Sequence, residues 1–168
     1  KWLETISQNI SGIIEFRSMA KFVKGGASER ALTQVKAVDN EYPLIGNVQL
    51  ASGKSFKDVF RQPKSAVMES DLASRLGIDI GETFSLGLTK FVLRDIIQSS
   101  PDDAGTNFGF GPRTIIKSDD LLDSGLIAPG TLFTAKYRLL IDPFENLDEL
   151  RALAKIKFEN NGMRWRDA

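Results

Sequence analysis

The sequence predicts an α+β fold in which both ends of the chain form one subdomain and a β-rich segment is inserted between them. Three observations support this prediction. Alternating apolar residues mark two strands and a turn between residues 13 and 38. An amphipathic helix pattern follows Asp142. Between about residues 48 and 136, short apolar runs are separated by glycines, which is typical of small barrels or curled sheets.

At the amino-terminal end we expect a short helix over residues 1–10, because its apolar residues recur at helical spacing. Residues 13–23 then alternate as a half-buried strand. Paired glycines at 25 and 26 favour a hairpin turn, since glycine adopts positive φ without steric cost. Residues 30–38 return as the second strand of this hairpin.

At the carboxy-terminal end, residues 131–141 read as a long strand. Asp142 and Pro143 then predict the start of a helix, with aspartate as the cap and proline in the first helical position. Residues 164–166 read as a last short strand.

The middle of the chain is predicted as a series of short elements joined by turns. Strands are expected at 48–50, 65–68, 83–88, 91–97 and 113–116, short helices at 71–76 and 118–122, and a loop at 51–64. Ser118 is expected to cap the second of these helices, with Asp119 and Asp120 near its positive end.

The stretch from Val35 to Gly46 carries the most recognisable residues. A strand runs into an acidic turn and then into Tyr42 and Pro43, where proline fixes the backbone and restricts the residue before it. One interpretation is a rigid corner with Tyr42 packed beneath it. The other is a joint between subdomains or a partner contact at Tyr42 and Pro43.

Residues 99–112 form the most irregular stretch, with Phe108 and Phe110 placed among glycines. These two rings either fold back onto the core as a lid, because exposed aromatic patches are avoided, or form a partner-binding tip.

Composition excludes several classes of function. The chain contains no histidine and no cysteine, so a catalytic triad, a thiol nucleophile, a disulfide and a histidine or cysteine metal site are excluded. We therefore expect no cofactor and no metal. Basic and acidic residues number 22 each, which argues against a nucleic-acid binder. No apolar run reaches the ~20 residues that span a bilayer.

Enzymes that use only carboxylates stay open as an unfavoured alternative. The candidates are Asp102, Asp103, Asp119 and Asp120. Two of them read as helix-cap residues and two as part of a Pro-Asp turn, so no catalytic residue is predicted. An enzyme would need two carboxylates facing each other across a cleft.

Several short motifs together resemble the extracytoplasmic domain of FtsX/MacB-like ABC permeases, in the branch of large permeases described as lysophospholipase- or arylesterase-associated. The motifs are Phe16-Arg17-Ser18-Met19, Val35-Lys36-Ala37-Val38-Asp39, Tyr42-Pro43-Leu44, Leu76-Gly77, Gly81-Glu82, Gly111-Pro112-Arg113, Ser124-Gly125-Leu126-Ile127 and Pro129-Gly130. They occur in the order and at the spacing of that family.

The resemblance implies a discontinuous porter-like α/β-sandwich subdomain, here residues 1–47 and 137–168, with an inserted β-rich sabre-like subdomain at 48–136. Such domains usually have one more strand before the first helix. We therefore expect a chain taken from a longer protein, with an open sheet edge.

The resemblance also implies a non-catalytic periplasmic domain of an inner-membrane transporter. A separate cytoplasmic ABC ATPase subunit would hydrolyse ATP, and the permease would pass the motion to a substrate, or to a protein or lipid partner, in the periplasm. Membrane helices are expected in the flanking sequence. A free-standing soluble adaptor is the alternative, and polar flanks would favour it.

Overall fold

The computed structural model describes residues 1–101, 111–122 and 124–166, and it divides into two compact units. Unit 1 consists of Lys1–Ile10 and Leu139–Ala168, and unit 2 of Ser11–Arg138. The chain therefore leaves unit 1 and returns to it. The division at residues 47 and 137 expected from the family resemblance stays a prediction.

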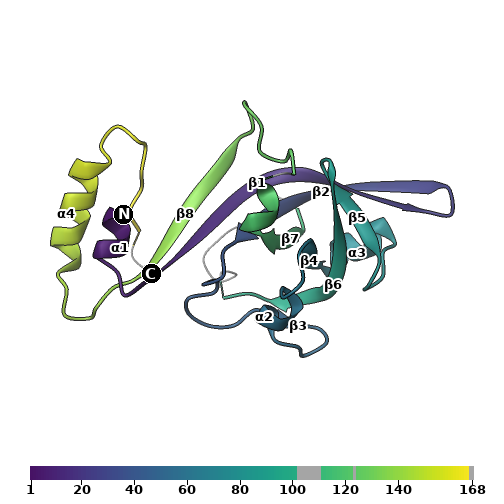
Figure 1. The fold of residues 1–168 in the computed structure, drawn as a ribbon, viewed down its shortest axis with the longest axis horizontal. Helices are drawn as coiled ribbons and strands as arrows, with labels where there is room; N and C mark the ends of the chain where they lie inside the picture. The colour runs from purple at the N-terminus through teal and green to yellow at the C-terminus, as the bar shows by residue number, and fades with distance from the viewer. Residues whose placement is uncertain (102–110, 123, 167–168) are drawn as a thin grey trace. The chain divides into compact units, whose positions relative to one another are not determined.

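The described residues form eight strands, four α-helices and one 3-10 helix (Figure 1). In chain order they are α1 (Trp2–Thr5), β1 (Asn9–Lys24), β2 (Ala27–Val38), β3 (Gln49–Leu50), α2 (Phe56–Val59), β4 (Ser65–Glu69), α3 (Ser70–Leu76), β5 (Thr83–Leu86), β6 (Thr89–Ser99), β7 (Arg113–Lys117), η1 (Ser118–Leu121), β8 (Phe133–Leu140) and α4 (Leu147–Lys157). This mixed content agrees with the predicted α+β class. None of these helices is long and apolar enough to cross a bilayer.

Six of the strands close on themselves to form a barrel. Their order is β2-β7-β4-β6-β5-β1, and β1 also pairs with β2. The β2–β7 and β4–β6 pairs are parallel, and the other described pairs in the barrel are antiparallel. Closure removes the free edges that an open sheet would expose. Strand β3 pairs with β6, and β8 ends the sheet beside β1.

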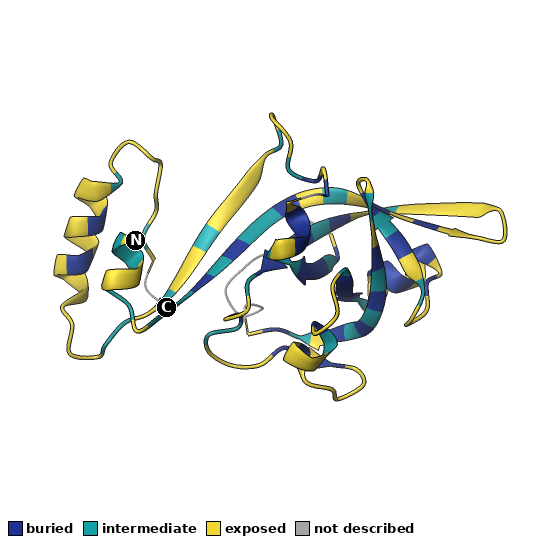
Figure 2. Cartoon of the chain, in the orientation of Figure 1, coloured by how far each residue is buried: buried dark blue, intermediate teal, exposed yellow. Residues whose placement is uncertain are grey.

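The side chains of unit 2 bury two apolar clusters (Figure 2). The larger one combines inward residues of the strands with the apolar face of α3, where Leu72 and Leu76 are almost fully buried. Gly77 ends α3 in the left-handed conformation, as the sequence predicts for a glycine cap. The smaller cluster surrounds Tyr42 and includes Phe56 and Phe60.

Unit 1 is held by contacts between its two chain segments. The backbone N–H of Gln8 donates to the carbonyl of Leu140 at 2.7 Å. The ring of Trp2 packs edge-on against Phe158 with centroids 5.8 Å apart. Lys157 lies over the Trp2 ring, with Nζ 5.8 Å from its centroid. The two contacts of the Trp2 ring link α1 to the end of α4.

Three terminal predictions are wrong. The first helix has only four residues, because the chain turns extended at Asn9 and enters β1. The last helix starts at Leu147 rather than after Asp142, since the Asn146 side chain caps it. Residues 164–166 form no strand.

Two predictions in the middle also need correction. The stretch 51–64 is not wholly a loop, because α2 forms within it and buries Phe56. The short helix predicted at 118–122 is a 3-10 helix over Ser118–Leu121, but Ser118 is not its cap, because the cap position is Lys117 and no side chain caps it. The predicted hairpin is confirmed, with Gly25 and Gly26 both at positive φ.

The tip of the β1–β2 hairpin is braced by an ion pair to the segment before β5. Lys24 Nζ lies 2.8 Å from Glu82 Oε1 and 3.7 Å from Asp79 Oδ2. The hydrogen bond from Lys24 lowers the pKa of Glu82, and the backbone N–H of Asp79 adds to this effect. The same bond raises the pKa of Lys24.

We predict that Glu82→Gln lowers the thermal unfolding midpoint slightly at pH 7 and by less at pH 3. A carboxyl with a lowered folded-state pKa stabilises above its unfolded pKa of about 4.3, and this stability is lost as the pH falls through the folded-state pKa. The shift stays small because the pair is exposed. Glu29→Gln, an exposed glutamate of the same hairpin, is the control. An equal shift at both pH values would contradict the ion-pair explanation.

Candidate functional site

Residues 39–46, which we call the corner, follow β2. The carboxylate of Asp39 holds this segment in place. Asp39 accepts a hydrogen bond from the Ser11 hydroxyl at 2.9 Å and another from the backbone N–H of Gly12. It also accepts from the backbone N–H of Tyr42 at 3.1 Å. Since these donors belong to β1 and to the corner itself, Asp39 fixes the corner onto the barrel.

Tyr42 is packed under the corner and is only 2% exposed. Its ring meets Phe56 edge-on, with centroids 5.8 Å apart. Its hydroxyl lies 3.2 Å from the Ser100 hydroxyl, and Lys36 Nζ donates to it at 3.4 Å. The ring is therefore packed in the core beneath the corner. Whether the corner acts as a joint stays a prediction.

The other side of the corner faces outward. Pro43 follows a cis peptide bond and is half-buried, while Ile45 is 72% exposed. Gly46 has a φ of +77°, and a Cβ there would lie 3.0 Å from the Pro101 side chain. Only glycine meets both conditions without strain.

A cavity of about 360 Å³ lies beside the corner. Its lining combines the aromatic residues Tyr42, Phe56 and Phe60 with the cations Lys57, Arg61 and Lys117. The one carboxylate that the described residues contribute to the lining belongs to Asp39 and already accepts structural hydrogen bonds. Among the described residues, the cavity therefore lacks the facing carboxylates that a hydrolase without histidine or cysteine would use.

The other candidate residues are distributed as follows. Asp102, Asp103, Phe108 and Phe110 lie outside the described residues. Asp120 is buried and accepts from the backbone N–H of Lys64 at 3.2 and 3.3 Å, and Lys64 Nζ lies 3.4 Å from it. Asp120 lies in the first turn of η1, as predicted, and it also holds Lys64 in a left-handed turn at φ +54°.

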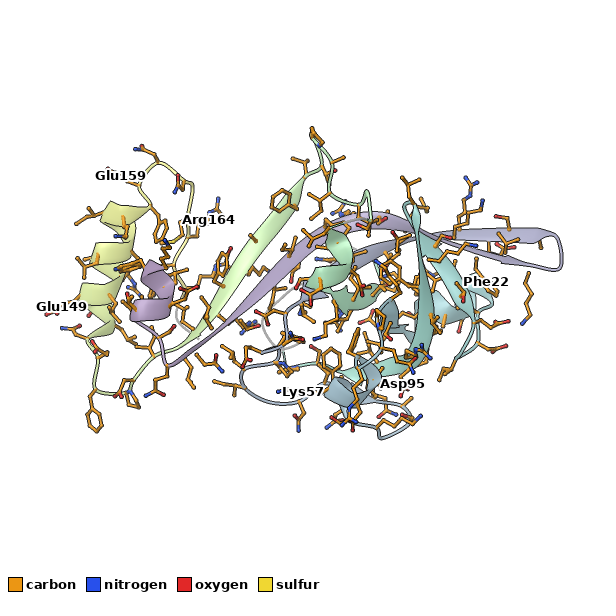
Figure 3. All side chains as sticks on the ribbon, viewed as in Figure 1. Phe22, Lys57, Asp95, Glu149, Glu159 and Arg164 are labelled. Carbon is orange, nitrogen blue, oxygen red and sulfur yellow. The ribbon has the colours of Figure 1, made fainter. Side chains whose placement is uncertain are left out.

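Sequence reasoning missed the carboxylates that anchor loops, half-buried Asp39 and buried Asp95. Asp39 was expected only as a turn residue, although aspartate often accepts from backbone N–H groups two or three positions later. Asp95, labelled in Figure 3, is fully buried in β6 and accepts from the backbone N–H and hydroxyl of Ser52. A lone aspartate on the inward face of this strand, where Phe91, Leu93 and Ile97 are apolar, was the available signal. Among the described residues, no group of three or more acidic side chains suits a metal ion.

Comparison with known families gives the chain its assignment. The family described as the MacB-like periplasmic core domain matches residues 3–153. The chain belongs to this family. It is a periplasmic domain of the kind found in ABC transporter permeases, as the sequence motifs suggested.

Individual relatives agree with the family. An uncharacterized ABC transporter permease of Escherichia coli, YbbP, is 30% identical over 108 residues, which are 64% of this chain. The chain covers only 13% of the length of that relative.

Two solved structures share the fold. The extracellular domain of the noncanonic ABC-type transporter YknZ from Gram-positive bacteria has a TM-score of 0.62 at 11% identity, over 97% of this chain and 82% of that one. The periplasmic region of MacB from Actinobacillus actinomycetemcomitans has a TM-score of 0.58 at 12% identity, over 94% and 69%.

We predict that Asp39→Ala lowers the free energy of unfolding by about 2–3 kcal/mol, because it leaves several donors of the corner without an acceptor. Chemical denaturation of both proteins measures the change. Glu29→Ala, which removes an exposed carboxylate, should cost less than about 0.5 kcal/mol. Equal losses in the two variants would show that charge, not the hydrogen bonds of Asp39, is responsible.

We further predict that Tyr42→Phe lowers the free energy of unfolding by about 1 kcal/mol, because it removes a buried hydroxyl and leaves Ser100 and Lys36 short of one partner. Tyr137→Phe is the matched control, since Tyr137 is 62% exposed. Denaturation curves of the two variants should separate. Coincident curves would mean that the Tyr42 hydroxyl contributes nothing to stability.

Proposed function

We propose that this domain has no chemistry of its own and passes movement, driven by a cytoplasmic ABC ATPase, from an inner-membrane permease to a partner or substrate in the periplasm. Membership of a periplasmic domain family found in ABC permeases supports the setting. ABC permeases work with an ATPase subunit, so the energy source lies outside this domain.

The proposal rests on how the chain connects its two units. It passes from unit 1 to unit 2 between Ile10 and Ser11, and back between Arg138 and Leu139. The first crossing lies inside β1 and the second inside β8. A strand transmits displacement better than a flexible loop, because its backbone is extended and hydrogen-bonded.

Unit 2 has the properties of a body that moves without deforming. Its six-stranded barrel is closed, and Asp39, Asp95 and Asp120 tie adjoining loops to it. Packed cores resist gradual deformation, so a force applied through β1 and β8 would displace the unit as a whole.

We predict that ATP changes the distance between the two units within the whole permease. The chain contains no cysteine, so spin labels can be placed at Ser74→Cys in unit 2 and Lys155→Cys in unit 1, once cysteines elsewhere in the permease are replaced. Pulsed electron paramagnetic resonance with the ATPase present should show a different distance distribution with and without ATP.

A second label pair inside unit 2, at Ser74→Cys and Lys54→Cys, is the matched control and should give one distribution in both states. Insertion of a short Gly-Ser segment between Ile10 and Ser11 should abolish the ATP-dependent change and leave ATP hydrolysis intact. An unchanged distribution for the pair spanning both units would contradict the proposal.

A further inference from the structure

Four strands of the barrel place three cations in one row. Lys21 on β1 pairs with Arg30 on β2 and with Ser85 on β5, and Ser85 pairs with Lys90 on β6. We call Arg30, Lys21, Ser85 and Lys90 the basic row. Neighbouring strands lie ~4.8 Å apart, so the row spans about 14 Å.

The row lies on the outer face of the barrel. The three cations are exposed, whereas the residues next to them in sequence, Phe22 and Phe91, are buried in the core. Side chains alternate between the two faces of a strand, and directly paired residues share a face. The register therefore places all four members on the solvent side.

The cations of the row have no acidic partner among the described residues. The nearby carboxylate of Glu82 is occupied by Lys24. Like charges directly opposite each other on two strands are destabilising, so the Lys21–Arg30 pair opposes folding. The chain as a whole carries equal numbers of acidic and basic residues, so this concentration of charge is local.

Exposed apolar side chains flank the row on the same face. Met19 and Leu32 are paired across β1 and β2 and are 49% and 46% exposed. Val23, beyond Lys21 on β1, is 58% exposed. Apolar residues surrounded by charge are the usual composition of a protein-binding surface, and methionine adapts readily to a partner.

We propose that the basic row and its apolar neighbours bind an acidic segment of a periplasmic protein, with carboxylates facing the cations and apolar side chains covering Met19 and Leu32. Charge complementarity identifies the occupant. Recognition of anionic lipid typically uses four to eight basic residues, and the row has three, so a protein segment is favoured over a membrane surface. This inference rests on the proposed function, because it names the surface on which a periplasmic partner docks.

The test uses a fluorescein-labelled peptide of three Glu-Leu-Glu-Ser repeats as the probe. Fluorescence anisotropy with the 168-residue chain should show binding that weakens as salt is raised, because salt screens charge pairs. A peptide with glutamine in place of glutamate should bind at least about tenfold more weakly. The triple variant Lys21→Gln, Arg30→Gln, Lys90→Gln should lose the same factor for the glutamate peptide. Its thermal midpoint should not fall, because the variant removes the repulsion between Lys21 and Arg30.

The matched control is the triple variant Lys54→Gln, Lys57→Gln, Lys155→Gln, which removes the same charge from other exposed sites and should bind like the native chain. Equal weakening in both triple variants would overturn the proposal, as would equal binding of the two peptides. Vesicles of phosphatidylglycerol and of phosphatidylcholine test the membrane. Loss of phosphatidylglycerol binding in the row variant, with no effect on peptide binding, would also overturn it.

Failure of this binding test leaves the ATP-dependent distance change unaffected, because that measurement needs no partner on the row. Conversely, a chain that binds the peptide through the row in a permease without ATP-driven movement would refute the proposed function alone.

Discussion

The register between β1 and β2 is the constraint on which the rest of unit 2 depends. It runs without a shift from Ile13 opposite Val38 to Lys24 opposite Ala27. Because side chains alternate with a period of two, a slip of one residue would bring Lys21 inside and Phe22 outside. The same pairing closes the barrel, so an error here would open the whole sheet. The glycine turn and the alternating apolar pattern specify this register locally.

Once the barrel is closed, its connecting segments are held by three carboxylates, of which Asp95 and Asp120 are buried and Asp39 is half-buried. Asp39 holds the corner, Asp95 holds the turn at Ser52, and Asp120 holds the turn at Lys64. A buried carboxylate is costly unless donors surround it, and each of these three accepts from at least one backbone N–H. No buried side-chain nitrogen or oxygen of the described residues lacks a partner. Loops fixed in this way move with the barrel, which is what a transmitting body requires.

The sequence predicts those parts of the fold that depend on local pattern. The hairpin follows from alternation and from Gly25 and Gly26, and α3 ends at Gly77 as expected. Predictions failed where two local signals compete. Asp142 and Asn146 both suit a helix cap, and the structure uses Asp142 to accept from Phe144 in a turn and Asn146 to cap α4. The parallel pairing of β2 with β7 could not be predicted from local sequence, because the two strands are far apart in the chain.

Surface features, too, were predictable where they depend on neighbouring residues and unpredictable where they depend on the pairing of distant strands. Packing of Tyr42 beneath the corner was predictable, since proline and an acidic turn act within a few residues. The basic row was not, because Lys21, Arg30 and Lys90 lie on three strands and only the register brings them together. Equal totals of acidic and basic residues argue against a large basic surface that binds nucleic acid. They do not limit how many basic residues gather in one small patch. A neutral chain can therefore present a cationic face, provided that its acids are used elsewhere, as Glu82, Asp39 and Asp120 are here.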